Sequence, residues 1–226
     1  MEENKKEFSL NEEELAMKNQ LERMVDSYDS YMQKVTFGRD ELLRERTIQK
    51  SGIKEGDTIL EVGSGTGKLS LAAKRKAGKS GSVYGIDIIP GMIEVSKQKA
   101  KNAGENINFA LGSIAEIPHE DNKFDVVLCS FMIFHISEQT RQKGISEIYR
   151  VLKPSGRLFV VDSGLPKGGF QRAIAKLILG YMINHEVDEL EPLFTQSRII
   201  NVESGKIDFN VYGLSIVSYI SGVAQK

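Results

Sequence analysis

The stretch Ile59–Gly67, with the sequence ILEVGSGTG, decides the fold because it joins a buried strand to three closely spaced glycines. Its first four residues form an apolar run interrupted only by Glu61, which is typical of a central parallel strand covered on both faces. The glycines let the backbone turn sharply and approach a ligand without a Cβ in the way. Residues 68–77 follow as a predicted helix, whose first backbone N–H groups can face a bound polar group.

The spacing of the glycines separates two nucleotide-binding interpretations. They follow the pattern G-x-G-x-G, whereas a dinucleotide fingerprint requires G-x-G-x-x-G and would need glycine in place of Lys68. The P-loop pattern G-x-x-x-x-G-K-[ST] cannot be placed here either. Two acidic residues accompany the loop, Glu61 just before it and Asp87 at the end of the next apolar run. This arrangement favours an adenosine ligand without a pyrophosphate over a tight glycine turn that binds nothing.

The composition is that of a chain with balanced charge. Its 226 residues include 30 basic and 31 acidic side chains, so no net field favours nucleic acid or an anionic membrane as the main partner. Cys129 is the only cysteine, which excludes an intrachain disulfide and an all-cysteine metal site, and no metal is expected. The charged start MEENKKEF lacks a signal-peptide core, and residues 209–224 are too short and polar for a membrane span. We expect a cytoplasmic protein with a small-molecule partner.

The chain ahead of the first strand predicts a helical N-terminal cap, residues 1–52. Its expected parts are a helix with a capping box at Ser9 and Glu12 that runs to about Ser27, an aromatic segment Tyr28–Gly38 that needs a surface to cover, and a helix Asp40–Ser51 with Gly52 as its C-terminal cap.

Residues 53–226 are expected to form an α/β domain, a Rossmann-like doubly wound sheet that is mostly parallel with an antiparallel last strand. The strands expected after the first are Val83–Asp87, Ile107–Leu111, Asp125–Cys129, Arg157–Asp162 after a turn at Lys153–Gly156, and an antiparallel pair, Ile199–Phe209 and Leu214–Val223. Of the helices expected between them, one starts at Pro90 and ends at Gly104, and another has an apolar face with Ile145, Ile148, Tyr149 and Leu152. Two more are expected to span Phe170–Asn184 and Glu189–Ser197. The apolar stripe of Phe170–Asn184 packs in the core, roofs a substrate pocket or meets a second subunit as a homodimer.

The candidate ligand residues follow the ends of neighbouring strands. In an open α/β sheet a ligand binds outside the carboxyl ends of the strands, near the point where strand order reverses. The residues that this rule selects are Gly63, Ser64, Gly65, Thr66 and Gly67 after strand one, Asp87 after strand two, Ser113 and Ile114 after strand three, and Ser130 after strand four. Asp87 is suited to accept both hydroxyl hydrogens of a ribose, and Ile88 and Met92 to hold an adenine ring, roles compatible with helix capping and packing.

Five motifs in order carry a family resemblance. The stretches that carry it are ILEVGSGTG, VYGIDIIPGM (83–92), GSIAEIP (112–118), FDVVLCSFMIFHI (124–136) and RVLKPSGRLFVVD (150–162). Together they resemble a class I S-adenosylmethionine-dependent methyltransferase, of the methyltransferase type 11 group. YDSYMQKVTFG (28–38) is similar to a segment of the menaquinone and ubiquinone C-methyltransferases, in which a Tyr-Asp pair lies over the cofactor.

The resemblance implies S-adenosylmethionine as cofactor and S-adenosylhomocysteine as product. Carried over by motif, the residues implied to contact the cofactor are Thr66, Asp87, Ser113, Ile114 and Ser130, with the glycine loop against its methionine end, and Glu61 is also expected to bind the cofactor. Ser113 stands where many relatives have Asp, and the segment after strand five is shorter than in the quinone-type relatives. Relatives that methylate arsenite use several cysteines, so a single Cys129 excludes arsenite as the acceptor.

Methyl transfer from a sulfonium needs alignment and exclusion of water more than acid–base groups. If the acceptor must lose a proton, His135 is the best candidate base, although a histidine in an apolar stretch is often only packed. Tyr28 and Tyr31 are candidates for a lid, and neither His119 nor His185 belongs to a motif. We expect a small-molecule methyltransferase. The alternatives are methylation of a protein or nucleic acid, and a non-catalytic member of the fold that binds an S-adenosyl ligand.

Overall fold

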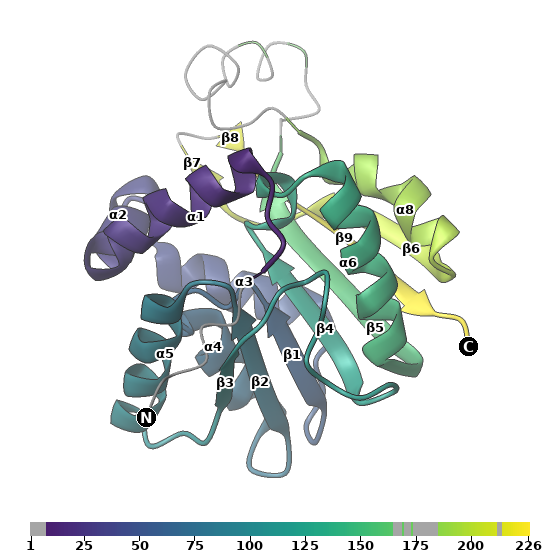
Figure 1. Ribbon diagram of the computed structural model, residues 1–226, viewed down its shortest axis with the longest axis horizontal. Coiled ribbons are helices and arrows are strands. Elements are labelled where there is room, and N and C mark those ends of the chain that lie inside the picture. The colour runs from purple at the N-terminus through teal and green to yellow at the C-terminus, as the bar shows by residue number, and fades with distance from the viewer. Residues whose placement is uncertain (1–7, 165–168, 170–172, 174–184, 212–213) are drawn as a thin grey trace.

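The computed structural model describes residues 8–164, 169, 173, 185–211 and 214–226. Its centre is a sheet of seven strands in the order β3-β2-β1-β4-β5-β9-β6 (Figure 1). The strands are β1 Thr58–Val62, β2 Ser82–Asp87, β3 Asn108–Leu111, β4 Phe124–Ser130, β5 Leu152–Ser163, β6 Ile199–Lys206 and β9 Val217–Ala224. The first five strands are parallel, and β9 runs antiparallel to β5 and β6. This confirms the predicted doubly wound fold, with strand order reversing between β1 and β4.

Helices cover both faces of the sheet because side chains on each strand alternate between two cores. Ile59 of β1 packs with α3 (Asp40–Ser51), α4 (Lys68–Ala77) and α5 (Pro90–Asn102). Leu60 and Val62 point the other way, into the core that contains α6 (Glu138–Val151) and α8 (Glu191–Gln196). Two residues of the apolar face predicted for α6, Ile145 and Ile148, are fully buried in this core. Two helices on the first face have the bounds predicted from the sequence. The helix α4 spans the predicted residues 68–77, and α3 has Gly52 as its C-cap in the left-handed conformation (φ 74°).

The N-terminal segment differs in detail from the expectation. The capping box is formed by Asn11 and Glu14 rather than by Ser9 and Glu12, so α1 begins two residues later than predicted and spans Glu12–Met24. A 3-10 turn, η1 (Val25–Ser27), leads into a further helix, α2 (Tyr28–Val35), which accounts for most of the aromatic segment. In Figure 1 these purple helices lie at the upper left, over one end of the sheet. A turn containing Phe37 and Gly38, both left-handed, then joins α2 to α3.

The C-terminal part confirms the antiparallel pair, β6 with β9, although both strands are shorter than predicted. A small hairpin, β7 (Asn210–Val211) with β8 (Leu214–Ser215), lies between them in the chain. The expected helix 189–197 is η3 (Val187–Leu190) followed by α8. The expected turn at 153–156 lies inside β5, where Ser155 is left-handed and the register with β4 breaks. The expected helix 170–184 lies outside the described residues, apart from residue 173.

Candidate cofactor site

The glycine loop has a backbone that only glycine adopts without strain. Gly63, Gly65 and Gly67 have φ values of 71°, 49° and 77°. The amides of Gly63 and Ser64 both donate to the carbonyl of Ile86, 2.8 and 3.0 Å away, so the loop folds back onto β2. A Cβ on Gly63 would lie 2.8 Å from Cγ of Met132. The loop therefore depends on glycine for its conformation and for the approach of neighbouring side chains.

Asp87 joins the glycine loop to the start of α5. Its Oδ2 accepts from the amide of Gly65 (2.8 Å) and its Oδ1 from the amide of Ile89 (3.0 Å). Burial raises the pKa of this carboxyl group, although the hydrogen bonds from the two amides lower it. The helix α5 has Ile89 as its N-cap and no side-chain cap, so Asp87 holds the turn ahead of the helix rather than capping it, and it also lines a cavity. A carboxylate has about four acceptor sites, so two remain for a ligand.

A large open cavity, of about 910 Å³, lies outside the carboxyl ends of the strands. It brings together most of the predicted cofactor residues: Gly63, Gly65, Asp87, Ile88, Met92, Ser113, Ile114 and Ser130. Ile88 is partly exposed to the cavity, whereas Met92 is nearly buried beneath it. The hydroxyl of Ser113 accepts from the amide of Ala115 (3.2 Å), so it serves a local turn. One wall is therefore acidic at Asp87 and apolar at Ile88 and Met92.

A second, polar cavity of about 610 Å³ lies on the other side of the glycine loop. Glu61, Ser64 and Thr66 line this second cavity and do not line the larger one. Glu61 accepts a hydrogen bond from the hydroxyl of Ser70, and burial raises the pKa of Glu61 to about 8. The hydroxyl of Ser64 is buried without a hydrogen-bond partner. Gly67 lines neither cavity, because a Cβ there would lie 2.8 Å from Cβ of Ser96 in the core.

Tyr28, the first residue of α2, lines both cavities, as do Gly63, Gly65, Ser130 and Phe131. Its ring atom Cε1 lies 3.9 Å from where a Cβ on Gly65 would stand. Burial and the neighbouring charge of Asp87 raise the pKa of its hydroxyl to about 12, so the ring stays neutral. Tyr31, the other expected lid residue, is 42% exposed and lines neither of these two cavities. Tyr28 therefore lies where a lid residue would stand and Tyr31 lies outside both cavities, and the lid role stays a prediction.

The helix α1 forms the roof of the larger cavity, a feature that the sequence patterns did not reveal. Leu10, Met17 and Leu21 face the cavity from this side. The carboxylate of Glu14 fastens the helix, since its Oε1 accepts from the amide of Ser137 at the start of α6 (2.9 Å). Glu14 is almost fully buried, and its partly apolar neighbours on α1 give the cavity a hydrophobic side.

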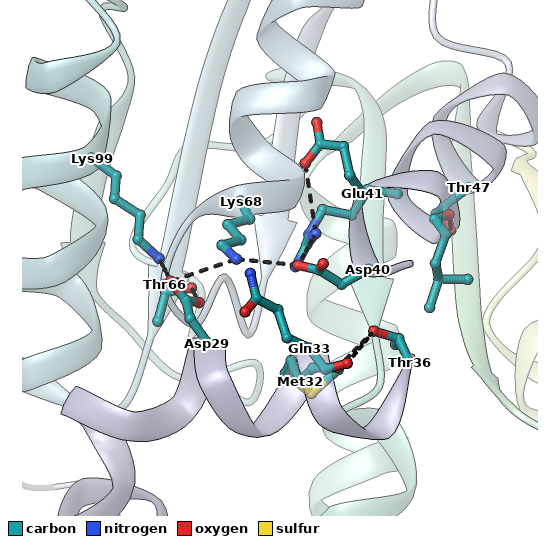
Figure 2. A network of polar contacts seen from close by, with 12 residues as sticks. Asp29, Met32, Gln33, Thr36, Asp40, Glu41, Thr47, Thr66, Lys68 and Lys99 are labelled. Atoms are coloured by element: carbon teal, nitrogen blue, oxygen red, sulfur yellow. Dashed lines mark hydrogen bonds and ion pairs between the residues drawn. The ribbon is translucent and has the colours of Figure 1, made fainter. Parts of the chain in front are cut away.

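A network of charged side chains next to the glycine loop was also missed. Asp29 accepts from the hydroxyl of Thr66 (2.8 Å) and pairs with Lys99 and Lys68 (Figure 2). Lys68 also binds Asp40 (3.1 Å). Thr66, expected to contact the cofactor directly, therefore has its hydroxyl turned toward Asp29. The signals in the sequence that point to this network are Asp29, the acidic residue after Tyr28, and Lys68, the lysine at the start of a predicted helix.

His135 stands at the rim of the larger cavity, in the short helix η2 (Ile133–His135). Burial of the ring and the neighbouring His185 lower its pKa, which keeps it neutral and able to accept a proton at pH 7. His185 stacks on Phe134, with ring centroids 4.9 Å apart. His119 packs edge-on against Tyr84 (5.2 Å) away from the cavity. Of the three histidines, His135 is the one placed where a methyl acceptor could lie.

The described part of the chain holds neither a cluster of metal ligands nor a membrane-spanning helix. Within it, no three His, Cys, Asp or Glu side chains gather in a group suited to a metal ion, and Cys129 is buried. Among the helices of that part, none is both long and apolar enough to cross a membrane.

Comparison with known proteins gives one family. The model of the ubiE/COQ5 methyltransferase family matches residues 8–182. A ubiquinone/menaquinone biosynthesis C-methyltransferase from Haemophilus ducreyi is 32% identical over 157 residues, which are 69% of this chain and 60% of that protein. The chain thus spans about three fifths of the length of the curated relatives it matches.

Solved structures show the same fold. A S-adenosylmethionine-dependent methyltransferase from Aquifex aeolicus superposes with a TM-score of 0.66 at 21% identity, over 86% of this chain and 97% of that one. Phosphoethanolamine N-methyltransferase 2 from Haemonchus contortus, in complex with S-adenosylmethionine, gives a TM-score of 0.63 at 17% identity, over 81% and 52% of the two chains. The arrangement of sheet and helices described above is therefore shared with methyltransferases that differ widely in sequence.

Proposed function

Because this chain belongs to the ubiE/COQ5 methyltransferase family, whose model matches it over residues 8–182, we propose that it transfers a methyl group from S-adenosylmethionine to a small-molecule acceptor. The observation that carries the proposal is the larger cavity. It joins a glycine loop, a buried carboxylate and an apolar wall at the point where strand order reverses.

The residues present fit an S-adenosyl ligand. Asp87 retains acceptor capacity for two ribose hydroxyls, and Ile88 and Met92 offer an apolar surface for the adenine ring. Beside Tyr28, the second cavity holds Glu61 and the unpartnered hydroxyl of Ser64, which suit the ammonium and carboxylate of an amino acid. Glu61, Ser64 and Thr66 thus stay in the proposed cofactor site through this cavity, whereas Gly67 serves it indirectly by shaping the loop.

When bound, S-adenosylmethionine supplies a methyl group activated by a sulfonium. The chain's own contribution is to hold the two substrates and to exclude water. Tyr28 and the apolar side of α1 cover the cavity, and the neutral ring of His135 is placed to accept a proton from an acidic acceptor. A carbon or oxygen nucleophile that must lose a proton suits this arrangement.

We infer that the acceptor is a quinone precursor. The relatives are named as ubiquinone/menaquinone biosynthesis C-methyltransferases. An aromatic acceptor with an apolar tail suits the side of the cavity lined by Leu10, Met17, Leu21, Met132 and Ile136. A protein or nucleic acid is less favoured as acceptor, because the cavity lies beneath a helical roof and the chain has a net charge of only −1.

Calorimetry followed by a transfer assay tests this function. We expect S-adenosylmethionine and S-adenosylhomocysteine to bind to the folded protein, and label from the methyl group to appear in a short-chain hydroquinone. If neither S-adenosyl compound binds, the methyltransferase proposal is wrong. Binding without transfer to hydroquinones, and with transfer to a protein or nucleic acid from a cell extract, would instead support the second class of acceptor.

A further inference from the structure

Asp29, the second residue of α2, contacts three separate elements at the edge of the cofactor site. Its Oδ1 accepts from the hydroxyl of Thr66 in the glycine loop (2.8 Å). Its Oδ2 pairs closely with Lys99 of α5 and lies 3.6 Å from the ammonium of Lys68, the first residue of α4. Although burial alone raises it, the hydrogen bonds from Lys99 and Thr66 hold the pKa of Asp29 below its usual value. One carboxylate therefore ties α2 to the loop and to two core helices.

The same lysine extends the network to α3. Lys68 lies 3.1 Å from Asp40, which in turn pairs with Arg44 one helical turn later (2.7 Å). Figure 2 shows Asp29 and Asp40 approaching the Lys68 ammonium from two different helices. The Asp40 and Arg44 side chains are only 9% and 14% exposed, so this half of the network is shielded from solvent. It gives Lys68 a fixed position from which to hold α2.

The helix α2 packs less deeply than its neighbours. Its residues are at most partly buried, Tyr28 among them, whereas α3, α4 and α5 each have several fully buried residues. The turn that follows α2 contains two left-handed residues, Phe37 and Gly38, so its backbone is not that of a continuous helix. The polar contacts of Asp29 therefore provide the main link between the start of α2 and the core. Tyr28 is the adjacent residue, and its place over the glycine loop depends on that link.

We propose that Asp29 is a positioning residue of the cofactor site, which holds Tyr28 over the glycine loop and thereby slows the release of a bound S-adenosyl ligand. The inference rests on the proposed function. It extends that function by identifying the contact that closes the roof. Because Tyr28 and α1 cover the larger cavity, a ligand leaves when the roof moves, and the contacts of Asp29 break in that movement.

The partial exposure of these ion pairs suits reversible opening. The side chains of Asp29, Lys68 and Lys99 are 32%, 23% and 24% exposed, so water and ions can reach them when α2 moves. The roof has a second attachment, the bond from Ser137 to Glu14 at the far side of the cavity. With that attachment in place, loss of Asp29 frees the α2 end of the roof while α1 stays fastened.

The release rate of S-adenosylhomocysteine tests the proposal directly. We expect Asp29→Asn to release it about tenfold faster, with a smaller change in the association rate, because weakened contacts act mostly on dissociation. The matched control is Asp26→Asn, an exposed acidic residue three positions earlier whose side chain has no polar contact within the described residues. The control should release the ligand at the wild-type rate.

A second pair of variants keeps the test independent of the fold of α2. Lys99→Met removes a partner of Asp29 from the core side, and we expect a smaller acceleration in the same direction. Its control is Lys97→Met on the same helix, since the one ion pair of Lys97 within the described residues is with the exposed Glu94 (3.4 Å). Thermal unfolding of all four variants shows whether any has lost its structure.

A double-mutant cycle separates positioning of Tyr28 from general stability. If Asp29 acts through Tyr28, Asp29→Asn accelerates release much less in a Tyr28→Ala background than in the wild type. Equal release from Asp29→Asn and Asp26→Asn, or full additivity with Tyr28→Ala, overturns the proposal. Absence of S-adenosylhomocysteine binding to the wild-type protein is a different result, because it overturns the proposed function itself.

Discussion

The carboxylate of Asp87 accepts a hydrogen bond from the backbone amide of Gly65, with 2.8 Å between Oδ2 and the nitrogen. This contact links the end of β2 to the tip of the glycine loop, so the residue proposed to bind the ribose also fixes the loop beside it. Changes at Asp87 should therefore act on the ligand and on the loop together.

Asp87→Asn should weaken S-adenosylhomocysteine binding by about 1.5–3 kcal/mol, the range for hydrogen bonds to a charged group. An amide cannot accept with both atoms, so the thermal stability should also fall. Isothermal titration and thermal unfolding measure the two effects. Asp125→Asn is the control, since Asp125 also accepts a backbone N–H, from Thr58 (2.8 Å), at the opposite end of the sheet. An unchanged affinity in Asp87→Asn would remove Asp87 from the ligand site.

Alanine substitutions of the two apolar residues assigned to the adenine ring should have different effects, because the two side chains differ in burial. Met92 is 2% exposed, and Met92→Ala should lower the free energy of unfolding by about 2–5 kcal/mol through the cavity it leaves. Ile88 is partly exposed to the cavity, so Ile88→Ala should change the free energy of unfolding little but weaken ligand binding by about 1–2 kcal/mol. Denaturant unfolding and calorimetry on both variants test this contrast. Equal effects on affinity and stability in the Ile88 variant would contradict it.

Glu61 should make the stability of the protein depend on pH. Burial raises its pKa from 4.5 to about 8 in the folded state, so the folded protein retains a proton that the unfolded chain releases. The stabilisation is complete below about pH 4.5 and is lost as the pH rises toward 8. Glu61→Gln is neutral at every pH and should remove this part of the dependence. Denaturant midpoints between pH 5 and 8.5 measure it, and parallel curves for the two proteins would show that Glu61 ionises normally.

Ligand binding should also release a proton from Glu61. An ammonium group placed in the second cavity favours the ionised carboxylate and lowers the pKa of Glu61. At pH 7, S-adenosylhomocysteine should therefore release a fraction of a proton, visible as a dependence of the binding enthalpy on buffer. The Glu61→Gln variant should show no such release. The same release from both proteins would place the amino-acid end of the ligand elsewhere.

His135 should set the acid side of the pH profile for methyl transfer. Its pKa is below the usual value of 6.5, so transfer should fall only as the pH drops below that value and the base becomes protonated. His135→Gln should lower kcat by about 10²–10⁴-fold if the ring acts as a general base. In His185→Gln the loss of a neighbouring charge should raise the pKa of His135 and move the acid limb to higher pH. NMR titration of the His135 ring measures this pKa without an acceptor.

Much of the fold followed from local patterns. The helix 68–77 and the end of α3 at Gly52 were predicted to the residue, because glycine and apolar periodicity mark such boundaries strongly. The capping box was placed two residues early, since Ser9 and Asn11 are equally good caps and only the packing of Glu14 against Ser137 selects one. Strand order reversal was expected, and with it the position of the larger cavity.

The less predictable features are contacts between segments distant in the chain. Thr66 was assigned to the cofactor by its motif, but its hydroxyl is bound to Asp29, 37 positions earlier. Glu61 and Asp87 were expected at one site, and they line two adjacent cavities that share Tyr28 and part of the glycine loop. Such relations depend on how α2 packs across the loop, and no periodicity in the sequence encodes that packing.

The side chain of Lys68 affects which nucleotides this protein can bind. It occupies the position at which a dinucleotide-binding loop would need glycine, and its charge is neutralised by Asp29 and Asp40. Lys99 and Arg44 also pair with these two carboxylates, so the Lys68 ammonium at the start of α4 is already engaged by neighbouring side chains. A lysine in place of the third glycine thus disfavours NAD and related dinucleotides through the shape of the loop.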